Sequence, residues 1–239
     1  MRRTWALVLE SPAMTASMDS LMQSASAALV AMDYLTCEAL CTRALAMARQ
    51  AKDWDSFARI LLPLQESRRQ RRITAAGGTI RLGTTLLAGE PVEWLDTVDA
   101  ACIVLTHPHD RAGAERLHEA ARKQGKYVEV LLADNPASAK TWTIRSFLGP
   151  DVRCERPRPP KVVIDRWMAA TDATATAAVD WFLDAAEALG DAALQEVSPD
   201  VHGVDRVTAL EQRLAAAGDH ERLHQSLWEA ARQAAAAES

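Results

Sequence analysis

The residues with the clearest potential for chemistry directly follow an apolar segment. Residues 100–107 read AACIVLTH, and Thr106-His107-Pro108-His109-Asp110 closes this run. A continuous apolar run without alternation predicts a strand that is covered on both faces. Two imidazoles that flank one residue in an extended segment can bind a single metal ion. The segment is therefore a candidate ligand or metal site.

A second polar group follows the next predicted strand. Residues 127–133 (YVEVLLA) form that strand, residues 110–123 form an amphipathic helix before it, and Asp134-Asn135-Pro136 comes after it. A strand, a helix and a strand with short connections predict parallel strands, whose carboxyl ends meet at one edge. We therefore expect one ligand-binding rim containing His107, His109, Asp110, Asp134 and Asn135. The alternative is that Asp110 caps a helix and that Asp134-Asn135-Pro136 forms a simple turn.

The His-X-His segment resembles part of the metallo-β-lactamase signature, in which a strand ends in Thr-His-X-His-X-Asp-His. This resemblance implies zinc-dependent hydrolysis, with His107, His109 and Asp110 among the zinc ligands. The match is partial, because Asp110 follows His109 immediately and Arg111 stands where the last histidine belongs. We therefore predict no catalytic residue and no cofactor, and leave the metal open.

Composition and charge limit the class of protein. The chain has 239 residues, of which 49% are hydrophobic, and many of these are alanines that favour closely packed helices. The net charge of −5 argues against general affinity for nucleic acid. A basic run, Arg68, Arg69, Arg71 and Arg72, ends a predicted helix. We interpret it as a solvated helix end, with contact to phosphates as the weaker alternative.

The cysteines and the apolar segments bear on the location of the protein. Cys37 and Cys41 are four residues apart on a predicted helix, where they fit as small buried residues at a helix contact. The chain is far longer than a small disulfide-bonded secreted domain, and it has no run of about 18 apolar residues. We therefore expect reduced thiols, a cytoplasmic location and no membrane partner.

Helical periodicity dominates both ends of the chain. Apolar stripes predict helices over 18–32, 35–51 and 54–72, and again over 173–197, 204–217 and 219–236. The predicted fold class is α/β with predominant helix, in which helical hairpins at both ends flank a small, mostly parallel sheet segment. The expected organisation is a helical region at 18–72, an α/β segment at 73–155, a proline-rich linker at 156–171 and a C-terminal helical region at 172–237.

The hairpins at the two ends resemble the tetratricopeptide repeat, a pair of antiparallel helices about 34 residues long. Met32-Asp33-Tyr34 and Gly218-Asp219-His220 correspond to the turn between the helices of such a repeat. This resemblance implies a scaffold that binds other proteins, and Trp54 would begin a further repeat.

The functional prediction is a non-catalytic protein–protein interaction or scaffold protein with a protein partner. Trp54 and Trp228 are candidate partner-binding residues if they are exposed, because aromatic side chains concentrate binding energy. If they are buried they are packing anchors, together with Tyr34, Leu214 and Leu227. The alternative function is an α/β small-ligand or metal-binding enzyme that uses the rim from His107 to Asp110 and Asp134.

Overall fold

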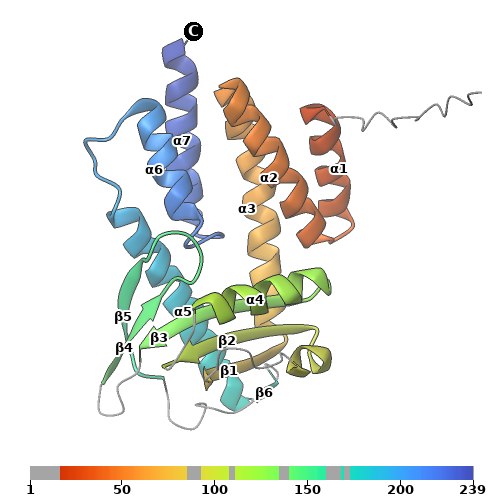
Figure 1. Ribbon diagram of the computed structural model, residues 1–239, viewed down its shortest axis with the longest axis vertical. Helices are drawn as coiled ribbons and strands as arrows, with labels where there is room; N and C mark the ends of the chain where they lie inside the picture. The colour runs from red at the N-terminus through yellow and green to blue at the C-terminus, as the bar shows by residue number, and fades with distance from the viewer. Residues whose placement is uncertain are drawn as a thin grey trace, which may run out of the picture.

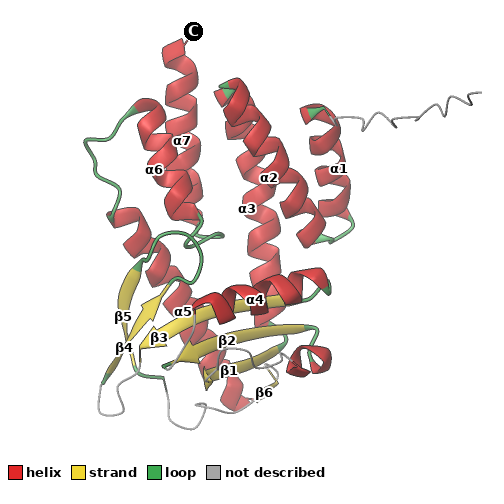
Figure 2. Cartoon of the chain, viewed as in Figure 1, coloured by secondary structure: helices red, strands yellow, loops and turns green. Residues whose placement is uncertain are grey.

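Helices open and close the described chain, and a sheet lies between them (Figures 1 and 2). The computed structural model describes residues 17–84, 93–107, 111–134, 140–159, 168–169 and 173–238. The helices are α1 (Met18–Val30), α2 (Tyr34–Ala51), α3 (Trp54–Ala76), α4 (Arg111–Lys123), α5 (Ala173–Gln195), α6 (Gly203–Leu214) and α7 (Glu221–Glu238), with a short 3-10 helix at Glu93–Thr97. The strands are β1 (Thr79–Thr84), β2 (Ala100–Thr106), β3 (Tyr127–Asp134), β4 (Thr141–Arg145), β5 (Arg153–Pro157) and β6 (Met168–Ala169).

A repeated turn separates α1 from α2 and α2 from α3. Met32 and Lys52 end the preceding helix in the left-handed conformation, with φ of 60° and 55°. Asp33 and Asp53 then cap the next helix, each accepting a hydrogen bond from the backbone N–H three residues later, at 3.1 and 2.9 Å. A left-handed residue followed by a capping aspartate reverses the chain sharply. The three helices therefore run up and down beside one another (Figure 1).

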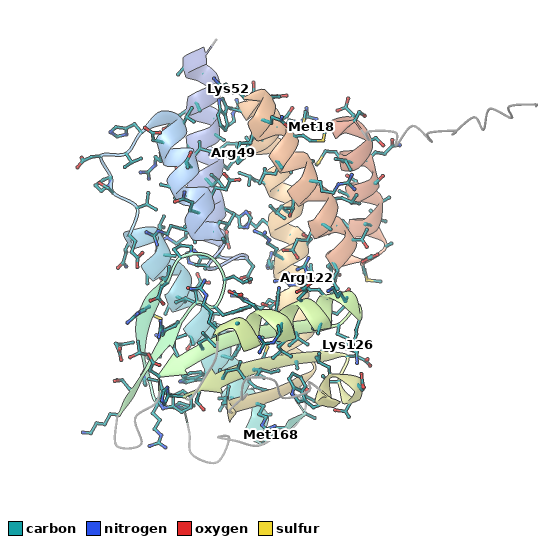
Figure 3. All side chains as sticks on the ribbon, viewed as in Figure 1. Met18, Arg49, Lys52, Arg122, Lys126 and Met168 are labelled. Atoms are coloured by element: carbon teal, nitrogen blue, oxygen red, sulfur yellow. The ribbon has the colours of Figure 1, made fainter. Side chains whose placement is uncertain are left out.

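The helical hairpins from the two ends of the chain pack against each other through α3 and α7. Leu223, Leu227 and Ala230 of α7 are buried in the same core as Phe57 and Leu64 of α3. A second contact joins α2 to α6. Arg49 of α2 (labelled in Figure 3) pairs with Glu211 of α6 and donates to Thr208 Oγ1 at 2.9 Å. Helices α1, α2, α3, α6 and α7 thus form one layer, whereas α5 packs against the sheet.

The six-stranded sheet has the order β5-β4-β3-β2-β1-β6. Its three central strands, β1, β2 and β3, are parallel, and β4, β5 and β6 add to them in antiparallel pairs. Alternate residues of β2 enter two different cores: Cys102 and Val104 face α3 and α5, whereas Ala101, Ile103 and Leu105 face α4. This two-sided burial explains the continuous apolar run in β2.

The predicted fold class is confirmed: a helix-rich α/β chain with helices at both ends and a sheet whose centre is parallel. The segment 156–171 is not only a linker, because Arg156 and Pro157 end β5 and Met168–Ala169 form β6. Proline is compatible with these positions because β5 is an edge strand. None of the helices in the described residues is long and apolar enough to span a bilayer.

Candidate functional site

The sheet edge that the sequence predicts as a ligand rim is partly described. The parallel register pairs Thr106 with Ala133, so β2 and β3 end side by side. His107 follows β2 and is exposed, and Asp134 ends β3 with its carboxylate 3.6 Å from Arg145 Nη1. His109, Asp110 and Asn135 lie outside the described residues. The described residues therefore place two of the five predicted rim residues at a common edge.

Among the residues that the structure describes, no group of three or more His, Cys, Asp or Glu side chains could hold a metal ion. Cys37 and Cys41 are fully buried, as their helical spacing predicts. Burial, together with the neighbouring Cys37 thiol, raises the pKa of Cys41 to about 12. A thiol that resists ionisation is a poor metal ligand and a poor nucleophile.

The sequence analysis interprets the basic run at the end of α3 as a solvated helix end, and the structure shows that this is wrong for three of its four arginines. Arg68, Arg71 and Arg72 are only 10–16% exposed, whereas Arg69 is 64% exposed and faces solvent. Positions 68, 71 and 72 share one helix face because they are three and four residues apart. That face docks against the sheet and the α6–α7 turn, which buries three guanidinium groups.

Glu38 of α2 is the centre of the resulting ion-pair network. Its side chain is 8% exposed and accepts hydrogen bonds from Arg68 Nε at 2.9 Å, Arg71 Nη1 at 2.5 Å and Arg122 Nη1 at 2.7 Å. Burial alone raises the pKa of Glu38, but Arg71, Arg68 and Arg122 outweigh burial and hold that pKa far below its ordinary value. Glu38 is therefore a permanent carboxylate that joins α2, α3 and α4. Figure 3 shows Arg122 on α4, at the junction of the helical layer and the sheet.

Three further contacts extend the network. Arg71 Nε donates to Glu129 Oε1 of β3 at 2.7 Å, and Arg72 pairs with Asp219 in the α6–α7 turn. Arg68 also donates to the carbonyl oxygen of Gly218 at 3.0 Å. The arginines of this helix face thus connect α3 to α2, to β3 and to the α6–α7 turn. Asp219 contacts Arg72 instead of capping α7, unlike Asp33 and Asp53 at the earlier turns.

A cavity of about 100 Å³ lies within this network. One wall is charged and carries Glu38, Arg68, Arg71, Arg72, Glu129 and Asp219, with His118 of α4 beside them. The rest of the lining is apolar and includes Phe147, Leu148, Phe182, Leu189 and Leu214. The cavity is therefore amphipathic, and it lies where the helical layer, the sheet and the α6–α7 turn meet.

The outer face of α3 carries a second feature, an exposed leucine between two apolar hollows. Leu62 is 62% exposed, although the neighbouring Leu61 is fully buried. One hollow, of about 310 Å³, lies toward α1 and is lined by Met18, Met22, Ile60 and Pro63 among others. The other, of about 260 Å³, lies toward α7 and is lined by Leu61, Gln65, Gln225 and Trp228 among others. Leu62 lines both hollows.

The two tryptophans predicted as partner-binding residues differ in exposure. Trp54 is 3% exposed and packs edge-to-face on Phe57, with ring centroids 5.7 Å apart, so it is a packing anchor and cannot present its ring to a partner. Trp228 is 41% exposed and lines the hollow toward α7. Leu214 and Leu227 are buried in the core, as predicted for packing anchors.

The sequence analysis did not identify Glu38 and Glu129 as members of an ion-pair network, or Leu62 as an exposed apolar residue. The spacing of Arg68, Arg71 and Arg72 on one helix face was a usable signal, because three arginines in a row on one side of a helix require carboxylate partners if that side is buried. Which carboxylates these are has no local signal, since Glu38 and Glu129 lie on other elements.

Comparison with known proteins gives no relative. A scan against protein-family models, a search of curated proteins and a search of solved structures each found no match to the chain. We therefore infer the function from the geometry of the chain itself.

Proposed function

We propose that this chain is a non-catalytic protein–protein interaction module of the cytoplasm, which binds an amphipathic helix of a partner protein across α3. The observation that carries the proposal is Leu62, an apolar side chain 62% exposed between two apolar hollows. Exposed apolar surface of this kind, bounded by polar residues, is typical of interaction sites.

The shape of the surface favours a helix as the occupant. An amphipathic helix places apolar side chains three and four residues apart, and such side chains can enter hollows on either side of a central ridge. Leu62 is that ridge, and Trp228 supplies a half-exposed aromatic ring in one hollow. Arg59 and Asp19 line the other hollow and give its border one charge of each sign.

The repeated turns support a relationship to tetratricopeptide hairpins in α1 to α3. The left-handed residue, the capping aspartate and the following aromatic residue recur at Met32-Asp33-Tyr34 and at Lys52-Asp53-Trp54. Repeat proteins of this type use the faces of neighbouring helices to bind partners. The surface around Leu62 is such a face, because α3 lies between α1 and α7.

The experiment selects amphipathic helical peptides that bind the chain and compares substitutions at two exposed positions. A phage-displayed library of amphipathic helical peptides is selected on the full chain, and the selected peptides are then measured against Leu62→Glu and Val30→Glu. Val30 is 85% exposed at the end of α1 and lines neither hollow, so it is the matched control.

We expect the selected peptides to bind the unmodified chain and Val30→Glu equally, and Leu62→Glu at least about tenfold more weakly. Neither substitution should change the thermal unfolding temperature. The proposal is overturned if no peptide is selected or if Leu62→Glu binds as well as the control. It is also overturned if sedimentation shows that Leu62 instead mediates contact with a second copy of the chain.

A further inference from the structure

The strand β5 presents an open edge. It is the outermost strand of the sheet, and β4 is its only neighbour in the described part of the sheet (Figure 1). The N–H of Ser146 donates to the carbonyl oxygen of Val152 at 3.1 Å, so the pair that adjoins β4 and β5 is hydrogen-bonded. Hydrogen-bonded and non-bonded pairs alternate along antiparallel strands, so Arg153 and Glu155 direct their backbone N–H and C=O groups away from β4. These groups have no hydrogen-bond partner among the described residues.

Both ends of this open edge are closed. Pro157 has no backbone N–H, and its carbonyl oxygen accepts a hydrogen bond from Trp181 Nε1 at 2.7 Å. Before β5 the chain turns, because the N–H of Val152 donates to the carbonyl oxygen of Pro150 at 3.0 Å. The open edge is therefore short and lies between Val152 and Pro157.

The side chains of the open edge carry both signs of charge. Arg153 and Glu155 are exposed and lie on the same face of β5, because they are two residues apart. Arg153 is 56% exposed, and its Nε donates to Asp151 at 3.0 Å. Glu155 accepts from Thr143 Oγ1 at 2.5 Å, and no cation pairs with its carboxylate in the part of the chain that the structure describes. An arginine and a glutamate at this spacing are self-complementary when a second copy of the strand runs antiparallel to the first.

We propose that β5 pairs with β5 of a second copy of the chain as antiparallel strands, with Arg153 of each copy opposite Glu155 of the other. In this register each Arg153–Glu155 pair exchanges both of its backbone hydrogen bonds, and opposite charges meet on the exposed face of the strands. The contact is closed, because both copies use the same strand. The opposite edge of the sheet is formed by the two-residue strand β6 and is too short to extend the assembly.

Charge selects this register among the alternatives. A shift in one direction that keeps the side chains on their faces places Glu155 opposite Glu155 of the second copy. The corresponding shift in the other direction places Arg153 opposite Arg153. Like charges directly opposite each other are destabilising, so both shifted registers are disfavoured. Charged residues on an edge strand commonly prevent sheets from pairing, but the alternating signs in β5 allow pairing with its own copy in one arrangement.

The contact is smaller than a standard protein–protein interface, so we expect a weak dimer with a dissociation constant in the high micromolar range. This proposal does not depend on the surface around Leu62, which lies on α3 and not on β5.

The test is sedimentation equilibrium of the full chain from about 10 μM to about 1 mM. Arg153→Glu and Glu155→Arg each place like charges opposite one another across the dimer. The double variant Arg153→Glu with Glu155→Arg restores opposite charges in the proposed register, although it loses the same contacts within the monomer. Arg69→Glu is the matched control, because it reverses a charge that is 64% exposed on α3. Leu62→Glu separates this contact from the proposed partner site.

We expect the unmodified chain, the double variant, Arg69→Glu and Leu62→Glu to dimerise alike, and each single variant of β5 at least about tenfold more weakly. Recovery in the double variant shows that the single variants do not act by unfolding the monomer. The proposal is overturned if the unmodified chain is monomeric throughout, if both single variants dimerise as well as the unmodified chain, or if the double variant does not recover. It is also overturned if Arg69→Glu or Leu62→Glu weakens the dimer as much as the single variants of β5. Failure to select a peptide for the surface around Leu62 leaves these expectations unchanged.

Discussion

His224 shows how burial fixes the state of a single residue. Its side chain lies in the core, and its Nε2 donates to the carbonyl oxygen of Gly218 at 2.9 Å. The other nitrogen, Nδ1, is buried without a hydrogen-bond partner in the described part of the chain. Burial, with the nearby Arg68, lowers the pKa of His224 to about 4, so the folded protein keeps this imidazole neutral.

This shift predicts acid sensitivity. Below pH 6.5 the unfolded chain takes up a proton at His224 that the folded protein does not accept until about pH 4, so stability falls as the pH falls through this window. Between pH 7 and pH 5 we expect His224 to account for a loss of about 2 kcal/mol in the free energy of unfolding. His118 adds to the loss in the same direction, because its pKa is also lowered. Urea denaturation at a series of pH values measures the slope.

His224→Gln isolates the share of His224, because glutamine can still donate to Gly218 but does not titrate. The slope between pH 7 and pH 5 should become shallower in this variant. His202→Gln is the control, since His202 is exposed. An unchanged slope in His224→Gln would show that His224 is accessible to protons in the folded protein.

The helix α5 depends on a glycine for its contact with the α6–α7 turn. A β-carbon at Gly190 would lie 2.2 Å from Cγ of His220, so the imidazole occupies the space that any other side chain would need. His220 Nδ1 accepts from the backbone N–H of Leu223 at 3.3 Å, and Nε2 faces Glu187 Oε1 at 3.1 Å. His220 therefore locks the start of α7 onto α5.

Gly190→Ala tests this contact, because the sign of its effect on the free energy of unfolding should depend on the residue at position 220. In the unmodified chain the added methyl group should lower the free energy of unfolding by about 1–3 kcal/mol, because α5 and the turn must separate. A His220→Gly background removes both the imidazole and the His220 β-carbon, which would lie 2.6 Å from the added one, so the clash with His220 is gone. In that background alanine should instead add up to about 1 kcal/mol through its higher helix propensity. A loss of equal size in both backgrounds would contradict the packing argument. Chemical denaturation of the four variants gives both values.

At the scale of the helices and strands, most of these elements were predictable from local sequence. The helices at 18–32, 35–51 and 54–72 were predicted to within a few residues of α1, α2 and α3, because periodicity and capping residues act over one or two turns. The continuous apolar run correctly predicted that β2 is covered on both faces. The strand β6 was not predicted, since two residues that pair with β1 leave no periodic pattern.

At the scale of the whole molecule, Glu38 connects the helical layer to the sheet region. It joins α2 to α3 and α4 directly, and Arg71 continues the connection to Glu129 of β3. A buried carboxylate held by three guanidinium groups stabilises this junction only while all of the charges are present. Removing one partner leaves the others buried without compensation.

Glu38→Gln should therefore lower the free energy of unfolding by about 3–5 kcal/mol, because Arg68, Arg71 and Arg122 lose their shared carboxylate. Glu66→Gln is the control on α3, since Glu66 is 41% exposed and its pair with Arg69 spans 3.8 Å at the surface. That change should cost less than about 1 kcal/mol. Equal and small effects in urea denaturation would show that the network adds little to the junction.

The candidate sites were less predictable than the elements. Sequence reasoning placed His107 and Asp134 at a common sheet edge, which parallel strands require. It left Trp54 open between core and surface and interpreted the arginines of α3 as solvated. In the structure Trp54 is buried, and three of the four arginine side chains are only 10–16% exposed. The exposure of a side chain depends on which elements pack on its helix face, and the sequence of the helix does not show which elements those are.

Local chemistry along the chain was thus enough to define seven helices, the parallel strands at the centre of the sheet and the sharp turn at Asp33, because each depends on neighbours a few residues away. Only the packing of distant segments decided that Arg72 meets Asp219, 147 positions later, and that Leu62 stays outside while Leu61 is covered. A charged or apolar side chain acquires its partner from the surface that covers it, and that surface exists only after the terminal helices and the sheet have come together.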